Sequence, residues 1–394
     1  MNREIFPTRL CPVCGGGGRT VLFHQSFEPF AGASLVSGYD VVICRDCGAG
    51  FADGIPPQSA FDAYYRDLSK YEGPATRREP PPVEQRFRDI AALVAEYIPD
   101  MESRVFEIGC ATGGLLKALQ DLGYRNLIGS DPSPGCVRQA LEFYGIPGFT
   151  ATVFSAPTPE QPYDFLILTG VMEHIPDLDR AIEQFRRLLR PGGRVFLEVP
   201  DASRYEARLD APFQEFSIEH INFFSRASLV NLMQVRGFRA VAAGHSIRPL
   251  HEVSCPCTFG VFENAWEPIP FEPDTVTEAG LRAYIEGCKG EDERIRLAIQ
   301  QSIPAGARMI VWGVGTHTLR LLATGGLDIQ RVALFVDSNP KYQQQELQGV
   351  PVVAPGELRE RTEPILISSR SSQHAIEDQI RNSLGLKNRL ILLY

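Results

Sequence analysis

Hydrophobic and polar positions alternate along the middle of the chain in a way that predicts strands and helices in turn. Short apolar runs rich in β-branched residues predict buried strands at 105–108, 127–130, about 150–154, 164–168 and 194–199. Between these runs, apolar residues recur at helical spacing and predict helices near 114–122, 135–144 and 177–190, the last one ended by Pro191-Gly-Gly193. Regular alternation of this kind is typical of an α/β fold with a doubly wound parallel sheet.

A second series of strand and helix patterns begins near residue 305. The predicted strands are 308–312, 332–336, 350–353, 365–368 and 390–393, and the predicted helices are 316–323 and 373–384. A Gly313-Val-Gly315 turn follows the first of these strands, and Asp337 follows the second. We therefore expect a second, Rossmann-like domain at the C-terminus. Thr318 stands where a dinucleotide fingerprint has its third glycine, so we expect this domain to bind no NAD.

Length and proline content predict how the chain divides into domains. A chain of 394 residues exceeds one typical domain. The proline-rich stretch 73–84 predicts a linker or stiff crossing segment. We expect domains at 1–72, 84–245 and 250–394, with a less regular bridge between about 250 and 300.

Net charge and hydropathy argue against nucleic acid and membranes as partners. A net charge of −9 argues against a protein that binds nucleic acid through the phosphate backbone. Apolar runs are shorter than a membrane span, and the N-terminus has no secretory h-region. We therefore expect a cytoplasmic protein with no nucleic-acid or membrane partner, whose cysteines are metal ligands or buried thiols rather than disulfides.

Two Cys-x-x-Cys-Gly knuckles lie near the N-terminus, with the cysteines at Cys11, Cys14, Cys44 and Cys47. Four thiolates complete the tetrahedral shell of zinc and leave no open position, so the spacing predicts a structural zinc ribbon. The alternatives are iron in the same cage and unligated thiols. Residues 1–72 contain six basic and eight acidic residues, a net charge of −2, so a nucleic-acid-binding ribbon is not expected.

The strand at 105–108 leads into a glycine turn in the order acid-x-Gly-x-x-x-Gly, formed by Glu107, Gly109 and Gly113. Such a turn points backbone N–H groups and a helix N-terminus at a ligand. The order resembles the first motif of class I S-adenosylmethionine (SAM) methyltransferases, in which the acid and the loop hold the amino-acid end of SAM. By the same resemblance Asp131 binds the ribose hydroxyls. The alternative is an ordinary tight turn of another doubly wound protein.

The order of modules resembles the nucleotide-sugar C-methyltransferases of deoxysugar biosynthesis, such as those of the tylosin and novobiocin pathways. These enzymes combine a four-cysteine zinc domain, a SAM domain and a C-terminal Rossmann-like domain, and the similarity covers essentially the whole chain. The landmarks that recur are the knuckles, Glu107-x-Gly109, Met172-Glu-His174-Ile175, Leu189-Arg-Pro-Gly-Gly193, Glu219-His220, Gly313-Val-Gly315 and Val336-Asp-Ser-Asn-Pro340.

The resemblance implies a reaction and the residues that perform it. Members of the family remove a proton next to a 4-keto group, and the enolate carbon takes the methyl group. The residues that match their reactive segments are His220 as the base, Glu219 beside it, and His174. The implied partner is a nucleotide-linked sugar, and we expect a monomer or weak oligomer. Tyr64, Tyr65 and Tyr71 form either a lid over SAM or ordinary packing.

One departure from the family pattern keeps other reactions open. The family usually has a tyrosine two residues before the glutamate, and this chain has Ser217 there. O- or N-methylation of a sugar or related metabolite, which needs only a base near a hydroxyl or amine, is therefore a competing expectation. A non-catalytic zinc-ribbon binding or scaffold protein is the alternative of another class.

Overall fold

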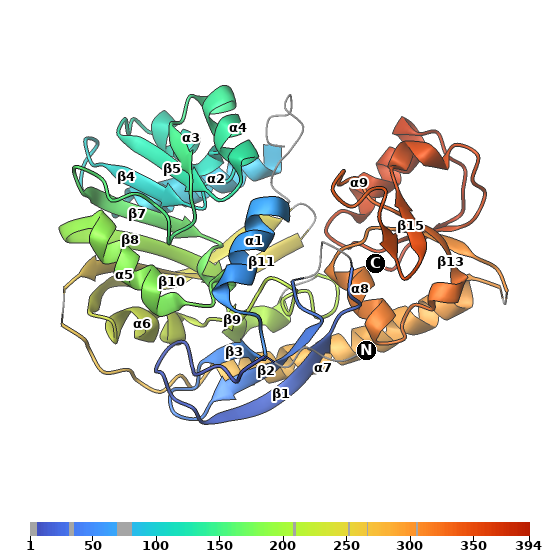
Figure 1. Cartoon of the computed structure of the whole chain (residues 1–394), viewed down its shortest axis with the longest axis horizontal. Helices are drawn as coiled ribbons and strands as arrows, with labels where there is room; N and C mark the ends of the chain where they lie inside the picture. The colour runs from blue at the N-terminus through green and yellow to red at the C-terminus, as the bar shows by residue number, and fades with distance from the viewer. Residues whose placement is uncertain are drawn as a thin grey trace.

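The computed structural model describes residues 6–30, 35–68, 81–207, 210–250, 253–265, 267–304 and 306–394. Most of the predicted linker at 73–84 lies outside these ranges, and so does Tyr71. Three sheets organise the described part of the chain (Figure 1).

The central sheet has seven strands in the order β10-β11-β8-β7-β4-β5-β6. The strands are β4 (Val105–Ile108), β5 (Leu127–Asp131), β6 (Gly148–Thr150), β7 (Tyr163–Thr169), β8 (Leu189–Pro200), β10 (Phe238–Leu250) and β11 (Val253–Asn264). Strands β4 to β8 are parallel, whereas β11 is antiparallel to both of its neighbours, β8 and β10. The predicted doubly wound α/β fold is confirmed.

Helices cover both faces of this sheet. They are α2 (Pro81–Ala95), α3 (Gly114–Asp121), α4 (Pro134–Tyr144), α5 (Leu178–Leu188) and α6 (Arg226–Gln234). Buried residues of α2, α3 and α4 share one hydrophobic core, and those of α5 and α6 share another, which also contains Cys11, Cys44 and Cys47, with Cys14 packed against it. Ser225 accepts a hydrogen bond from the Ser228 backbone and caps α6.

Three predictions for this region were wrong in detail. The strand predicted at about 150–154 is β6, which ends at Thr150, and residues 153–155 form a turn. Helix α5 ends at Leu188, and Pro191–Gly193 lie inside β8, where the register with β7 shifts. The stretch between 250 and 300 is regular rather than irregular, because β11 extends the central sheet and a helix of 26 residues, α7 (Thr277–Ser302), follows it. The central sheet therefore continues past residue 245, where we expected its domain to end.

The N-terminal sheet has four antiparallel strands in the order β1-β2-β3-β9. Three come from the N-terminus, and the fourth comes from far along the chain: β1 (Arg19–Ser26), β2 (Gly38–Cys44), β3 (Gly50–Asp53) and β9 (Asn222–Phe223). Helix α1 (Gln58–Leu68) follows β3 and leads toward the central sheet (Figure 1). The segment before β9 is thereby held against the N-terminal sheet.

The C-terminal sheet has six strands in the order β14-β15-β13-β12-β16-β17. The strands are β12 (Met309–Trp312), β13 (Val332–Val336), β14 (Glu346–Leu347), β15 (Val350–Val353), β16 (Ile365–Ile367) and β17 (Leu390–Ile391), with helices α8 (Thr316–Ala323) and α9 (Gln373–Asp378). All of its strand pairs are parallel except β14 with β15. Helix α7 runs from the N-terminal sheet to this sheet (Figure 1). One hydrophobic core contains buried residues of α7, the N-terminal sheet and the C-terminal sheet.

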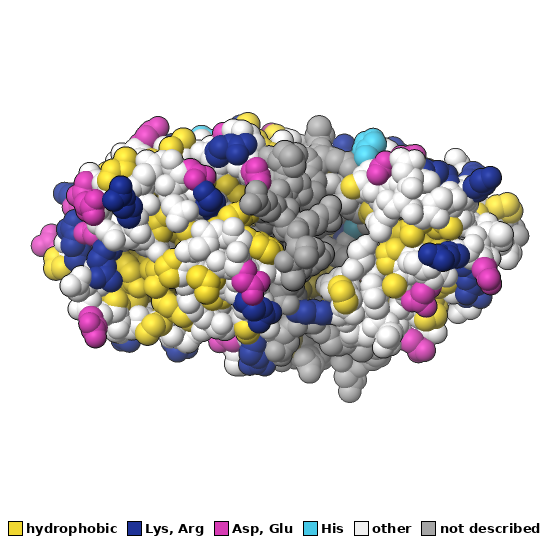
Figure 2. All heavy atoms as spheres, turned by 90° about the horizontal axis from the view of Figure 1, so that it is seen from above, with side chains coloured by type: hydrophobic (Ala, Val, Ile, Leu, Met, Phe, Trp, Pro, Cys, Tyr) yellow, Lys and Arg dark blue, Asp and Glu magenta, His cyan; other side chains and the backbone are white. Residues whose placement is uncertain are grey.

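Charged side chains of both signs are spread over the face of the molecule drawn in Figure 2. On the face seen in Figure 2, acidic and basic side chains of the described residues are interspersed rather than gathered by sign. Among the described helices, none combines the length and apolar character needed to cross a membrane.

Candidate functional site

The turn after β4 requires glycine at the predicted positions. Gly109 has a φ of 78°, and a Cβ there would lie 2.6 Å from Cγ2 of Val171. Gly113 has a φ of 83°, and a Cβ there would lie 2.9 Å from Cβ of Ala140. Both positions combine left-handed backbone with close approach of a neighbour, which only glycine tolerates without strain.

Asp131 fixes the shape of this turn from the end of β5. Its Oδ2 accepts a hydrogen bond from the backbone N–H of Ala111 at 3.0 Å, and its Oδ1 accepts one from Ser133 at 2.9 Å. Ala111 is held at a φ of 45°. Each carboxylate oxygen can accept more than one hydrogen bond, so Asp131 retains capacity to bind ligand hydroxyls.

Glu107 lies beneath the turn as a buried acid. Its side chain is 2% exposed, and within the described chain its Oε2 has no hydrogen-bond partner. Burial, reinforced by the nearby charge of Asp131, raises the pKa of Glu107 to about 8. A buried acid of this kind becomes a carboxylate when a ligand brings a positive charge to it, such as the amino group of SAM. The observed donor set therefore suits the amino-acid end of SAM.

The two predicted histidines come together at the carboxyl edge of the central sheet. His174 ends a short 3₁₀ turn, η1 (Met172–His174), that follows β7, and His220 lies two residues before β9. Their ring centroids are 4.9 Å apart with an interplanar angle of 63°. Nδ1 of His174 lies 3.1 Å from the backbone oxygen of Glu219. The edge where parallel strands end is where open α/β folds bind ligands.

Glu219 and two of the predicted tyrosines complete this group. The hydroxyl of Tyr64 donates a hydrogen bond to Oε1 of Glu219 at 2.9 Å, and Glu219 is buried. The ring of Tyr65 meets the ring of His174 edge-on, with centroids 5.7 Å apart. Helix α1 therefore contributes two phenols to the cluster of acid–base groups.

Ser217 has a structural task in the loop that carries His220. Its Oγ accepts hydrogen bonds from the backbone N–H groups of Glu219 at 3.3 Å and His220 at 3.1 Å. Its own carbonyl accepts one from the hydroxyl of Tyr39 on β2 at 2.8 Å. The position that the family fills with tyrosine therefore organises the loop backbone here.

Two buried glutamates beside the histidines were missed by sequence reasoning. Oε1 of Glu173 lies 3.9 Å from Nε2 of His174, and Oε2 of Glu215 lies 3.5 Å from Nδ1 of His220. Glu173, His174 and His220 each have a ligand-type atom within 4.8 Å of the others, so they are also a group that could hold a metal. Glu173 could have been found from the sequence, because it lies inside the Met172-Glu-His174 landmark. Nothing in the local pattern singled out Glu215, because its role depends on the folded loop.

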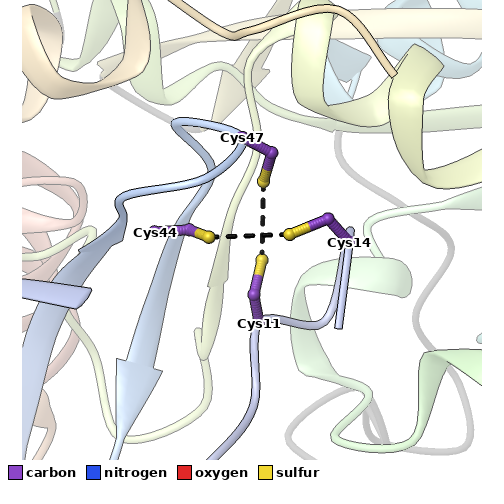
Figure 3. Close-up of side chains that lie close together, drawn as sticks. All are labelled: Cys11, Cys14, Cys44 and Cys47. Atoms are coloured by element: carbon purple, nitrogen blue, oxygen red, sulfur yellow. Dashed lines mark hydrogen bonds between the residues drawn. The ribbon is translucent and has the colours of Figure 1, made fainter. Parts of the chain in front are cut away.

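The four knuckle cysteines meet as predicted. Their sulfur atoms lie within 4.8 Å of one another and point toward a common centre (Figure 3). The Sγ–Sγ distance is 3.6 Å both for Cys11 with Cys47 and for Cys14 with Cys44. Four sulfurs about 2.3 Å from one zinc ion would lie roughly 3.8 Å apart, so the donor set fits tetrahedral zinc.

The C-terminal glycine turn has a backbone frame like that of the first one. Asp337 accepts hydrogen bonds from the backbone N–H groups of Val314 at 2.9 Å and Asn339 at 2.8 Å, as Asp131 does from its two partners. Thr318, in the place of a third glycine, is buried and donates to the carbonyl of Gly313 at 2.6 Å. Absence of dinucleotide binding stays a prediction.

Comparisons with known proteins agree that the region of the central sheet is a methyltransferase domain. Residues 83–243 match the family model described as a methyltransferase domain. An uncharacterized methyltransferase of Oceanobacillus iheyensis is 30% identical over 117 residues, which are 28% of this chain and 54% of that protein. A trans-aconitate 2-methyltransferase of Methylobacterium nodulans is 27% identical over 119 residues, or 30% of this chain and 46% of that protein. The chain thus spans about half the length of these curated relatives.

Solved structures give matches of the same kind. A SAM-dependent methyltransferase of Thermotoga maritima, titled as a possible histamine N-methyltransferase, is 21% identical with a TM-score of 0.38, covering 46% of this chain and 91% of that one. Magnesium protoporphyrin IX methyltransferase of Synechocystis is 16% identical with a TM-score of 0.36, covering 52% of this chain and 97% of that one. The family match and the curated relatives oppose the non-catalytic scaffold alternative. The chain therefore carries a class I SAM-dependent methyltransferase domain.

Proposed function

We propose that this protein transfers the methyl group of SAM to a carbon atom next to the keto group of a nucleotide-activated sugar. One observation carries the proposal, namely the imidazoles of His174 and His220 with centroids 4.9 Å apart among buried acids. The glycine turn lies close by, since a Cβ at Gly109 would come within 2.6 Å of Val171, which precedes η1. Methylation of carbon needs a base next to the methyl donor, and this cluster offers one. The module order resembling the nucleotide-sugar enzymes supports the choice of acceptor.

In this proposal His220 is the general base, with Glu219 and His174 beside it. His220 removes the proton from the carbon next to the ketone, and the electrons of the broken C–H bond form the enolate. SAM supplies an electrophilic methyl group, which the enolate carbon takes while sulfur keeps the electrons of the broken S–CH₃ bond. Glu107 would face the amino group of SAM, and Asp131 its ribose hydroxyls. The side chains of His174 and His220 are 12% and 18% exposed, which limits access of water to the enolate.

Ser217 favours a second candidate, methyl transfer to oxygen or nitrogen. Its hydroxyl binds the backbone of the loop, so position 217 offers no phenol to an enolate oxygen. The phenol of Tyr64, bonded to Glu219, partly offsets this loss and keeps carbon methylation ahead. The test is product analysis with labelled SAM and a panel of dTDP- and GDP-linked keto sugars. A carbon-13 methyl signal at a ring carbon supports the proposal, and a signal at an oxygen or nitrogen selects the alternative.

The choice of base is tested by a matched pair of variants, His220→Asn and His174→Asn. A positioned acid–base group contributes about 10²–10⁴ in rate, so His220→Asn should lower kcat by that range with SAM affinity nearly unchanged. If His174→Asn shows the larger loss, the two roles are exchanged. Losses below tenfold in both variants would contradict both assignments.

We also infer that Cys11, Cys14, Cys44 and Cys47 hold one structural zinc ion. Each knuckle closes on a glycine of left-handed φ, 76° at Gly15 and 78° at Gly48, as a two-thiolate turn requires. Coordination energy in such sites is folding energy, so Cys14→Ser should unfold the N-terminal sheet, with Cys288→Ser as a control outside the cluster. Elemental analysis should give one zinc per chain. Less than half an equivalent would contradict this inference. A second equivalent that is lost in His174→Asn would show an additional metal at the histidines.

The six-stranded C-terminal sheet is proposed to be a second Rossmann-like domain that borders the substrate. Its parallel core has the order β15-β13-β12-β16-β17, in which the chain starts at the centre and moves outward on both sides. Helix α7 and the shared core fix it against the N-terminal sheet and the loop that carries His220. A domain in this place can contact a large acceptor such as a sugar nucleotide.

A further inference from the structure

Each imidazole of the cluster has its own buried glutamate, but the two pairs differ in which ring nitrogen faces the acid. Glu173 faces Nε2 of His174, whose Nδ1 already faces the backbone oxygen of Glu219. Nδ1 of His174 therefore carries a proton, because a backbone oxygen can only accept, and its Nε2 is directed at Glu173. Glu215 faces Nδ1 of His220 at 3.5 Å, and its side chain is fully buried.

We propose that Glu215 is the positioning residue of His220: its carboxylate faces Nδ1 and favours the tautomer that carries its proton there, which leaves Nε2 as the basic nitrogen. A carboxylate in this position selects one tautomer and stabilises the imidazolium that forms when the ring takes a proton. In His174 only Nε2 can take a proton, and that nitrogen is directed at Glu173. The role of His220 as a base rests on the proposed function, whereas the pairing with Glu215 does not.

The fold holds Glu215 in place from three directions. Its backbone N–H donates to the hydroxyl of Tyr284 on α7 at 3.0 Å. The carbonyl of the next residue, Phe216, accepts from the side chain of Gln25 on β1 at 2.7 Å. On its other side, Phe213 is held at a φ of 57° with its N–H on Cys288. The N-terminal sheet and α7 thus set where the acid lies relative to the imidazole.

Glu173 and His174 from η1 also lie beside His220. Other titratable groups surround this cluster: Tyr64 bonds Glu219, Tyr65 meets the ring of His174, and the hydroxyl of Tyr284 accepts the backbone N–H of Glu215. Glu215 is fully buried and the side chain of His220 is 18% exposed, so the charge of the acid is poorly screened from the imidazole. Removing the charge of Glu215 should therefore lower the proton affinity of His220.

The experiment is a titration of the full-length protein by long-range proton–nitrogen NMR with labelled histidine. The chain has seven histidines, and His220→Asn and His174→Asn assign the two signals of interest. In the wild type we expect neutral His220 to carry its proton on Nδ1. Glu215→Gln should lower the titration midpoint of His220 by about one pH unit or more, a tenfold loss of proton affinity. Glu173→Gln is the matched control, which should shift the midpoint of His174 by more than that of His220, the reverse of the order expected for Glu215→Gln.

Two results would overturn the proposal. One is a wild-type His220 that carries its proton on Nε2, a readout that needs no variant. The other is a folded Glu215→Gln protein whose His220 midpoint is unmoved, with folding checked by thermal melting and SAM titration. Glu215→Asp keeps the charge and should retain most of the wild-type midpoint. If the pairing is found and His220→Asn is still fully active, the assigned base is wrong while the pairing stands.

Discussion

The two glycine turns of this protein share a backbone frame and differ in the chemistry placed on it. In both, an aspartate at the end of the second strand accepts N–H groups from the turn and from its own loop, through Asp131 and Asp337. Gly109 and Gly313 both have left-handed φ values, 78° and 104°. Two residues before these glycines, however, the first strand has Glu107 and the other has Val311.

The helices that follow the two turns, α3 and α8, also begin differently. The first helix begins after Gly113 at a φ of 83°, which keeps the backbone close to the ligand position. The other begins after Gly315 in extended conformation, and its first turn contains the buried His317. Burial lowers the pKa of His317 to about 3, so this ring is a neutral packing group hydrogen-bonded near Ser368. A shared frame therefore does not imply a shared ligand, and we propose that Glu107 and the glycine turn at 109–113 select SAM for the first turn.

The largest effect should come from adding one methyl group to the first turn. Gly109→Ala combines left-handed strain of about 1–2 kcal/mol with a contact near Val171 that costs roughly 1–3 kcal/mol more. SAM affinity should fall by about 100-fold or more in isothermal titration. Gly313→Ala is the matched control, because a Cβ there would find its nearest neighbour 3.5 Å away. It should lower thermal stability and leave SAM affinity intact; equal loss in both variants would contradict the comparison.

The paired aspartates give the next largest effect. Asp131→Ala removes a charged hydrogen-bonding partner and should weaken SAM binding by roughly 1.5–3 kcal/mol, at least tenfold. Asp337→Ala breaks the same backbone contacts in the other turn and should reduce stability without changing SAM affinity. Unchanged SAM affinity in Asp131→Ala, measured by calorimetry on folded protein, would show that the ribose is held elsewhere.

Glu107 makes SAM binding dependent on pH. The free protein keeps this acid protonated up to a pKa of about 8, above the ordinary 4.5, so its contribution to stability falls as pH rises between these values. A cationic ligand favours the carboxylate, so binding at pH 7 should release about one proton and affinity should rise toward pH 8. Calorimetry in phosphate and in Tris measures the released proton, and Glu107→Gln corrects for titration of the ligand itself. Equal binding heats in the two buffers would refute this linkage.

The last prediction is that the C-terminal turn binds no dinucleotide, so adding NAD or NADP should have no measurable effect. The buried Thr318 and His317 occupy the start of α8, and the hydroxyl oxygens of Thr318 and Ser368 lie 2.8 Å apart, within hydrogen-bond distance. NAD and NADP should therefore leave the intrinsic fluorescence and the melting temperature unchanged at micromolar concentration. Saturable binding that is lost in Asp337→Ala would show that the two turns are more alike than their side chains suggest.

Local patterns predicted the parallel strands, the glycine turns and the cysteine cluster, because each depends on neighbours in the sequence. The antiparallel strand β11 was missed because Pro256 interrupts its pattern, although this proline is paired with Ile247 in the sheet. The glycines of α7, such as Gly287 and Gly290, obscured a helix that tertiary packing stabilises. Glu215 could not be predicted at all, since its distance to His220 exists only once α7 and the N-terminal sheet hold the loop.

The central claim is that this cluster removes a proton from carbon beside the SAM site. Its most direct measurement is exchange of the C3 proton of a keto-sugar nucleotide with deuterium oxide, when SAM is replaced by its demethylated product. We predict exchange with the wild type and a loss of about 10²–10⁴ in its rate with His220→Asn. A methylated product formed by the wild type from a substrate that shows no C3 exchange would contradict the claim and assign the methyl group to oxygen or nitrogen.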